Sequence, residues 1–271
     1  MPPEASQSLI FLEADATDDA GGQPFVVVVR HRDDLIRWLR NAPSALQWIE
    51  VDGLLGDPEV WSFAAQGTDE IPLDVVVSAP GSQFADLYRL VDVRAVRDVR
   101  VSMTATTGFL KALRLAASLG FPVRLLPGQP SVEATSELST ALELYLHDPM
   151  VDAPIEYFHS ALARMRGAPT GSLWRVLEED PAIFRRENGQ KFRRAAETSA
   201  EFEPPAEFVS DFLAGLIERE AECATCHWQG FCEGYFKWPD PKYSCEGVKQ
   251  LFLRLEAAAK EIQDDLSTYA A

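Results

Sequence analysis

The sequence predicts an α/β protein whose body is a partial (β/α) barrel-like or open parallel sheet, followed by helices and a small cysteine-rich, metal-binding C-terminal lobe. Three observations predict this. Short apolar runs alternate with helical patterns up to about residue 130, helical periodicity takes over after Ser136, and all four cysteines of the 271 residues lie between Cys223 and Cys245. Continuous apolar runs are typical of strands that are buried on both faces. We therefore expect the body at 1–130, a helical region and linker at 131–205, and the lobe at 206–271.

The body begins with an acidic, Ala- and Gly-rich stretch in which residues 9–12 are expected to form at most an edge strand. The apolar run 25–29 predicts the first buried strand. Asp33 and Asp34 are expected to cap a helix that ends at Arg40, before a second strand at 46–51. The same patterns predict strands at 73–78, 99–103 and 121–126, with helices at 84–90 and 107–119.

Helical periodicity covers residues 136–166 and continues through 173–177, 183–184 and 208–217. A polar loop at 185–205 is expected to separate the body from the lobe. After Gly247 a last helix is predicted to pack the lobe onto the body or onto a partner. Its apolar stripe comprises Val248, Leu251, Phe252, Leu255, Ala259 and Ile262.

Charge and composition narrow the possible partners. The chain has 25 Lys and Arg against 42 Asp and Glu, a formal net charge of -17, which repels phosphate backbones and argues against nucleic-acid binding. The basic residues between 185 and 194 are more simply explained as a solvated face. A basic peptide or protein would be attracted by this charge. No apolar run approaches the roughly 20 residues of a membrane span, so no membrane association is expected.

The cysteine region has the spacing C-x2-C-x5-C-x12-C, formed by Cys223, Cys226, Cys232 and Cys245. A C-x2-C turn directs two sulfurs at one centre, and two further thiolates complete a tetrahedral set. The chain starts with Met1-Pro2-Pro3 and shows no signal segment, so we expect a cytoplasmic protein whose thiols stay reduced, and we favour a metal over disulfides.

Zinc and an iron-sulfur cluster both suit four thiolates. The second half of the motif is a single cysteine after a long aromatic loop, which favours a [4Fe-4S] cluster, with zinc as the alternative. Gly230 and Gly234 flank Cys232 and are expected to let backbone N–H groups point at sulfur. Six aromatic residues are expected to form a dry shell: Trp228, Phe231, Tyr235, Phe236, Trp238 and Tyr243.

This region, C-x2-C-x5-C followed by a later single cysteine within C-E-G-Y-F-K-W-P-D-P-K-Y-S-C-E-G-V-K, resembles the C-terminal SPASM region of peptide-modifying radical SAM enzymes. The resemblance implies that the four cysteines bind an auxiliary [4Fe-4S] cluster and that the body is a partial β/α barrel. Phe236 stands where that family has a cysteine of its other auxiliary cluster. The sequence also lacks the C-x3-C-x2-C triad that holds the SAM-cleaving cluster, so the resemblance is to half a SPASM region on a pseudo-radical-SAM body, and radical chemistry is not expected.

Other candidate residues follow from local patterns. His147 with Asp148, and His159 near Glu156, could support acid–base chemistry, although ordinary structural roles are commoner for such histidines. His227 is expected to make a hydrogen bond around the metal rather than to bind it. Ligands of parallel α/β folds bind beyond the carboxyl ends of the strands, where Gln129 and the Thr106–Gly108 turn are predicted to lie.

Three functions follow. The first is a non-catalytic partner in the maturation of ribosomal peptides, which binds a precursor peptide or a catalytic maturase subunit. The second is an iron-sulfur redox enzyme or electron carrier in such a pathway, with Lys237 offsetting the charge of a reduced cluster. The third is a zinc-stapled interaction module, in which the metal only stabilises the fold.

Overall fold

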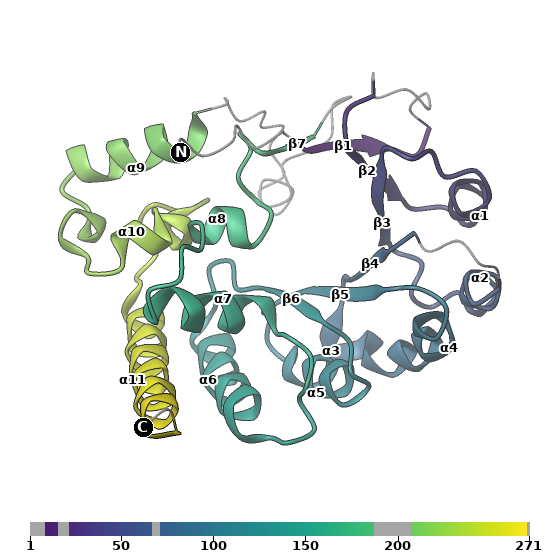
Figure 1. Cartoon of the computed structure of the whole chain (residues 1–271). Coiled ribbons are helices and arrows are strands. Elements are labelled where there is room, and N and C mark those ends of the chain that lie inside the picture. Colours follow the sequence, from purple (N-terminus) through teal and green to yellow (C-terminus); the bar gives the residue numbers. More distant parts are fainter. Residues whose placement is uncertain (1–8, 16–21, 67–70, 187–206, 270–271) are drawn as a thin grey trace.

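The computed structural model of the chain describes residues 9–15, 22–66, 71–186 and 207–269 (Figure 1). Within these parts seven strands form one sheet in the order β6-β5-β4-β3-β2-β1-β7, and every adjacent pair is parallel. The strands are β1 (Leu9–Glu13), β2 (Phe25–Val29), β3 (Leu46–Asp52), β4 (Leu73–Val77), β5 (Val99–Thr104), β6 (Val123–Leu126) and β7 (Phe184–Arg186).

The strand order confirms the predicted parallel α/β body. From β1 to β6 each strand lies beside the one that precedes it in the chain, as in a (β/α) barrel. Among the described residues β6 and β7 lie at opposite edges, so the sheet is open. β1 was expected at an edge, and this is wrong, because β7 pairs with its outer side. The expected helical character of 183–184 is also wrong, since Phe184 begins β7.

Helices cover the sheet and extend beyond it (Figure 1). Those of the body are α1 (Arg32–Arg40), α2 (Pro58–Ala64), α3 (Pro80–Gln83), the 3-10 helix η1 (Phe84–Leu90), α4 (Val91–Arg94) and α5 (Leu110–Ser118). Those that follow are α6 (Val132–His147), α7 (Glu156–Met165), α8 (Leu173–Val176), α9 (Phe208–Glu218), η3 (Glu222–Thr225), α10 (Gln229–Cys232), η4 (Tyr235–Lys237) and α11 (Glu246–Tyr269). Most of the loop expected at 185–205 lies outside the described residues.

Local chemistry explains several differences from the predicted boundaries. Helix α1 begins after His31, without a side-chain cap, so Asp33 and Asp34 lie in its first turn and do not cap it. The sequence patterns above do not predict α2, although Asp57 caps it by accepting from Glu59 and Val60 N–H and Pro58 occupies its first turn. Strand β6 begins at Val123, after Pro122, because proline has no N–H for the strand ladder.

Alternate residues of each strand face different surroundings. One set of side chains, including Val27, Ile49, Val75 and Val101, belongs to the large apolar core. On the opposite face, β1 and β2 carry a small apolar cluster, and the later strands carry charged and polar side chains. Its buried polar residues are Glu50 on β3, Asp74 on β4, Ser102 on β5 and Arg124 on β6.

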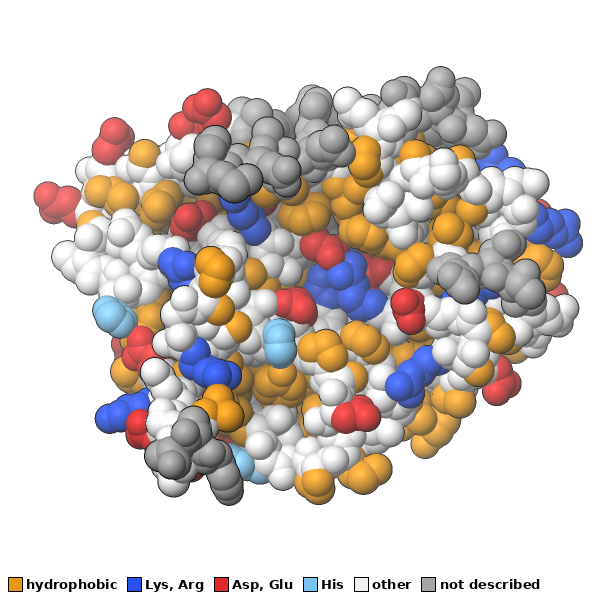
Figure 2. Space-filling model, in the orientation of Figure 1, with side chains coloured by type: hydrophobic (Ala, Val, Ile, Leu, Met, Phe, Trp, Pro, Cys, Tyr) orange, Lys and Arg blue, Asp and Glu red, His pale blue; other side chains and the backbone are white. Residues whose placement is uncertain are grey.

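These polar residues form one ion-pair network that extends to the segment after α8. Arg124 pairs with Asp74 at 2.5 Å, donates from Nε to Ser102 Oγ at 3.0 Å, and pairs with Glu178. Arg100 pairs with Asp74 at 3.0 Å and with Glu178 at 2.6 Å. Buried charges are tolerated when they are paired in this way. Because Glu178 follows α8 and pairs with arginines of β5 and β6, it fixes α8 against the sheet. Acidic and basic side chains gather around a hollow in the middle of this face (Figure 2).

The C-terminal helix α11 packs against α6 and α7, which confirms that it joins the cysteine region to the rest of the fold (Figure 1). Val248, Leu251, Phe252, Leu255 and Ala259 are buried along its stripe. Among the described residues, no helix combines the length and the apolar character that crossing a bilayer would require.

Candidate metal centre

The four cysteines lie on short elements that turn around one point. Cys223 is in η3, Cys226 follows that helix, Cys232 ends α10, and Cys245 immediately precedes α11. All four are free thiols, and all four line the same small cavity. The structure therefore brings together every residue that the sequence analysis proposed as a metal ligand.

The turn after α10 depends on two residues with left-handed backbones. Glu233 has φ 46° and Gly234 has φ 74°, so the chain reverses directly after Cys232. The backbone N–H groups of Tyr235 and Phe236 consequently donate to the sulfur of Cys232. Such N–H bonds orient a thiolate and stabilise its negative charge. Gly234 supplies the turn as expected, whereas Gly230 lies within α10 and is not left-handed.

Aromatic side chains line part of the cavity, and two of the six rings predicted to form a dry shell are among them. Trp228 and Phe236 line it together with Phe252 of α11. Behind them Phe231 and Tyr235 are buried, and Trp238 and Tyr243 are half-buried against the same core. The apolar part of the cavity wall is therefore formed largely by rings.

A carboxylate and two ammonium groups complete the lining. Glu222 Oε1 accepts from Lys237 Nζ at 2.5 Å and from the backbone N–H of Cys245 at 3.1 Å, and its other oxygen pairs with Lys249. Burial opposes ionisation of Glu222, but these donors outweigh it and lower its pKa to about 2. Lys237 is 5% exposed, and it acts electrostatically on Cys223 and Cys245.

Burial holds the thiols of Cys232 and Cys245 in their neutral form when no metal is bound. Burial raises the pKa of Cys232 to about 12, with a partial offset from the N–H groups of Phe236 and Tyr235 and a further rise from Cys223 and Cys226. Burial likewise raises the pKa of Cys245 to about 12, opposed by Lys237 and reinforced by Glu222 and Cys232. Each thiol is thus close enough to at least one other to affect its charge. A bound cation would offset the free-energy cost of ionising these buried thiols.

The size of the cavity restricts its occupant. Its volume is about 20 Å³, far below the roughly 300–1,000 Å³ of pockets that hold organic ligands. As the side chains stand, the cavity leaves no room for an organic ligand, and four thiols are the donor set of zinc and of iron-sulfur clusters. As the described side chains stand, no three Cys, His, Asp or Glu residues are gathered closely enough to hold one metal ion.

One buried polar atom near the thiols has no partner. The hydroxyl of Tyr157 is buried and makes no hydrogen bond, and Tyr157 interacts electrostatically with Cys232. A buried hydroxyl without a partner is costly, but Tyr157 does not line the cavity. The four-thiol donor set by itself fits a cluster at this position.

The histidines do not join the metal site. His227 Nε2 lies 3.1 Å from Glu256 Oε1 and its side chain is 76% exposed, so the expected hydrogen bond around the metal is made to a carboxylate outside the cavity lining. His147 lies 3.5 Å from Glu143 rather than beside the side chain of Asp148. His159 Nδ1 lies 3.0 Å from the hydroxyl of Tyr145.

The predicted strand-end residues have structural partners. Gln129 Nε2 donates to the carbonyl oxygens of Phe236 and Asp240, which attaches the end of β6 to the cysteine region. The backbone N–H groups of Gly108 and Leu110 donate to Glu137. A carboxylate of the chain itself therefore occupies the N-terminal end of this helix.

A second connection runs from the ion-pair network to the thiols. Trp174 Nε1 donates to the carbonyl of Glu233 at 3.0 Å, and the hydroxyl of Tyr235 donates to Glu179 at 2.6 Å. Glu179 follows Glu178, which holds Arg100 and Arg124. The sequence analysis missed this network and Glu222, although a charged residue within each apolar run of β3 to β6 was a visible signal of it.

Comparison with known proteins assigns the chain to no family. No protein-family model, curated protein or solved structure matches it.

Proposed function

We propose that Cys223, Cys226, Cys232 and Cys245 bind a [4Fe-4S] cluster. The observation that carries the proposal is that four free thiols, from three short segments, line one cavity too small for an organic cofactor. Aromatic rings exclude water from it, and Lys237 and Lys249 offset negative charge, as the environment of a four-thiolate cluster requires.

The cysteine motif favours a cluster over zinc. Its second half is a single cysteine after a long aromatic loop, whereas structural zinc sites usually have two C-x2-C-like halves. Zinc, which binds four thiolates at about 2.3 Å, is the alternative.

We further propose that the chain is a non-catalytic partner in ribosomal peptide maturation, binding a precursor peptide or a catalytic maturase. The SPASM-like cysteine spacing supports the pathway, and the four cysteines leave no thiols for a SAM-cleaving cluster. The sheet face opposite the large apolar core also supports a non-catalytic role for the body. On this face β1 and β2 carry apolar side chains, and the later strands carry the ion-pair network.

Metal analysis after anaerobic purification tests the cluster. We expect about four irons and four sulfides per chain and a brown colour. Cys→Ser substitution at any of the four positions should lower iron content, whereas His227→Ala, which changes an exposed neighbour outside the cavity lining, should leave it unchanged. One zinc per chain without sulfide would instead establish the zinc staple and end the cluster proposal.

Two activity measurements test the partner role on the same iron-loaded protein. With dithionite and SAM present we expect no 5′-deoxyadenosine, because the cluster has four protein ligands and no open iron. Reductive SAM cleavage would exclude the non-catalytic role. Rapid reduction by a flavodoxin followed by reoxidation by a maturase would identify an electron carrier.

A further inference from the structure

Glu222 stands directly before the first candidate ligand, Cys223, and it lines the same cavity as the four thiols. Its carboxylate accepts from the backbone N–H of Cys245 at 3.1 Å, although the two residues lie 23 positions apart. One side chain therefore joins the segment that carries Cys223 to the segment that carries Cys245.

Two lysines extend this connection to other elements of the cysteine region. Lys237 of η4 donates from Nζ to Glu222 Oε1 at 2.5 Å, and it also donates to the carbonyl oxygen of Tyr243. Lys249, in the first turn of α11, pairs with the other carboxylate oxygen of Glu222. Both oxygens of one carboxylate are thus held by charged donors from two elements, which fixes the position of the carboxylate.

The charge of Glu222 by itself opposes metal binding. Burial raises the pKa of Cys223 and Cys245, Lys237 lowers it, and the carboxylate of Glu222 raises it again. A negative group beside the thiols therefore makes their ionisation more costly. The favourable contribution of Glu222 to a four-thiolate site lies in the groups that it holds in place.

We propose that Glu222 is a positioning residue of the metal centre, which holds Cys223 and Cys245 at the spacing that the bound metal requires and keeps Lys237 and Lys249 beside them. Both of its oxygens are occupied by donors, so it acts through these partners and does not bind the metal. Groups that hydrogen-bond around metal ligands orient the ligands in this way. The inference rests on the proposed function, since it concerns the same four thiols.

A change of reach without a change of charge tests the positioning. Glu222→Asp keeps the carboxylate but is one methylene shorter, so it no longer reaches all three donors. Release of the metal from the full chain to a chelator should be about tenfold faster than in the wild type, an effect typical of losing a partner around a metal ligand. Glu218→Asp shortens an exposed carboxylate of α9 outside the cavity lining and should keep the wild-type rate. Wild-type release from Glu222→Asp would overturn the proposal.

A change of charge without a change of length gives the second readout. Charge alone predicts slower metal release from Glu222→Gln, because the thiolates lose a repulsive neighbour. Positioning predicts faster release, because an amide does not pair with both lysines. The reduction potential of the iron-loaded protein should become more positive in Glu222→Gln and stay near the wild-type value in Glu222→Asp. Slower release from Glu222→Gln, or equal potentials in the two variants, would overturn the proposal.

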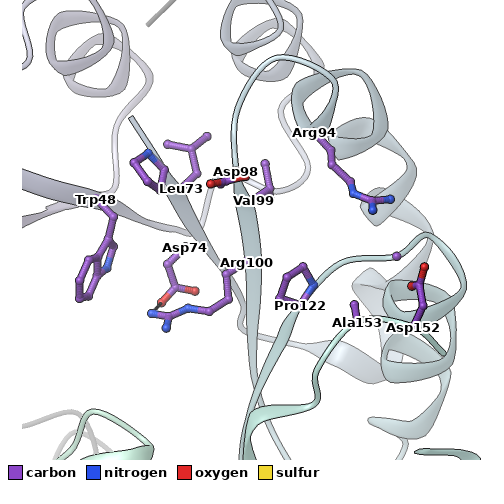
Figure 3. Close-up of a pocket in the computed structure, with 12 residues that line it drawn as sticks. Trp48, Leu73, Asp74, Arg94, Asp98, Val99, Arg100, Pro122, Asp152 and Ala153 are labelled. Atoms are coloured by element: carbon purple, nitrogen blue, oxygen red, sulfur yellow. Dashed lines mark hydrogen bonds and ion pairs between the residues drawn. The ribbon is translucent and has the colours of Figure 1, made fainter. Parts of the chain in front are cut away.

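A second cavity supplies the matched control for the loss of charge. Its volume is about 670 Å³, and it extends from Trp48 of β3 across the starts of β4, β5 and β6 to the loop before α7 (Figure 3). No cysteine lines it, and its Asp98 is exposed. Asp98→Asn should therefore leave the release rate and the potential at their wild-type values. Changes equal to those in Glu222→Gln would show a general effect of net charge and would contradict a specific role of Glu222.

The metal content of the wild-type chain separates this inference from the proposed function. Iron and sulfide in the wild type, with unchanged release from both Glu222 variants, would leave the cluster standing and remove the positioning role. One zinc without sulfide would end the cluster, and faster zinc release from Glu222→Asp would still support the positioning role. A wild-type chain that holds neither metal would overturn both. Circular dichroism checks the fold of each variant, and the release rate of Glu222→Gln decides if Glu222→Asp does not fold.

Discussion

Glu178 and Arg100 form a bidentate ion pair in which the two carboxylate oxygens accept from Nη1 at 2.6 Å and from Nη2 at 2.8 Å. The same carboxylate pairs with Arg124, which is buried on the sheet face opposite the large apolar core. Glu178 has φ 59°, a left-handed conformation that is unfavourable for any residue except glycine. The fold thus accepts backbone strain at the position that joins α8 to the sheet.

Glu178→Ala should lower the free energy of unfolding by about 3 kcal/mol, because Arg124 and Arg100 lose a partner while remaining partly or fully buried. Chemical denaturation followed by circular dichroism measures this. Asp86→Asn, which breaks the exposed i,i+3 pair with Arg89, serves as the control and should cost less than about 1 kcal/mol. Equal losses in the two variants would show that the network does not secure α8.

Glu178→Gly should be more stable than Glu178→Ala by about 1 kcal/mol, since both lose the carboxylate but only alanine keeps the left-handed strain. The same two substitutions at Glu59, within helix α2, should give the opposite order, because glycine is disfavoured in helices. Unfolding free energies of the four variants decide this. The same order at both sites would contradict the strain at Glu178.

Tyr235→Phe should destabilise the protein by about 1–3 kcal/mol, because Glu179 is buried and loses a donor. Iron content should be unchanged, since the backbone N–H of residue 235 that faces Cys232 remains. Thermal unfolding and iron analysis of the same preparation test both parts. Tyr88→Phe, at an exposed position, is the matched control.

Lys237→Met should make the reduction potential of the proposed cluster more negative. The substitution removes a buried positive charge beside Cys223 and Cys245, so an added electron is less stabilised. A redox titration monitored by absorbance measures the change. Lys242→Met removes an exposed charge from the same loop and should leave the potential nearly unchanged, and equal shifts in the two variants would argue against a specific role of Lys237.

The sequence by itself determined the parallel α/β body and the four ligand candidates. Apolar runs such as Phe25–Val29 are typical of strands buried on both faces, and the four thiols lie at most 22 residues apart in the sequence, which favours their meeting. These features are encoded locally, in periodicity and spacing.

Only the tertiary structure decided what surrounds those features. Strand β7 pairs with β1 across a separation of more than 170 residues, and Glu222 reaches Lys249 through the fold, so no local pattern specifies either contact. The same holds for the meeting of Arg100, Arg124 and Glu178, whose charges are stable in a buried position only because distant segments neutralise them.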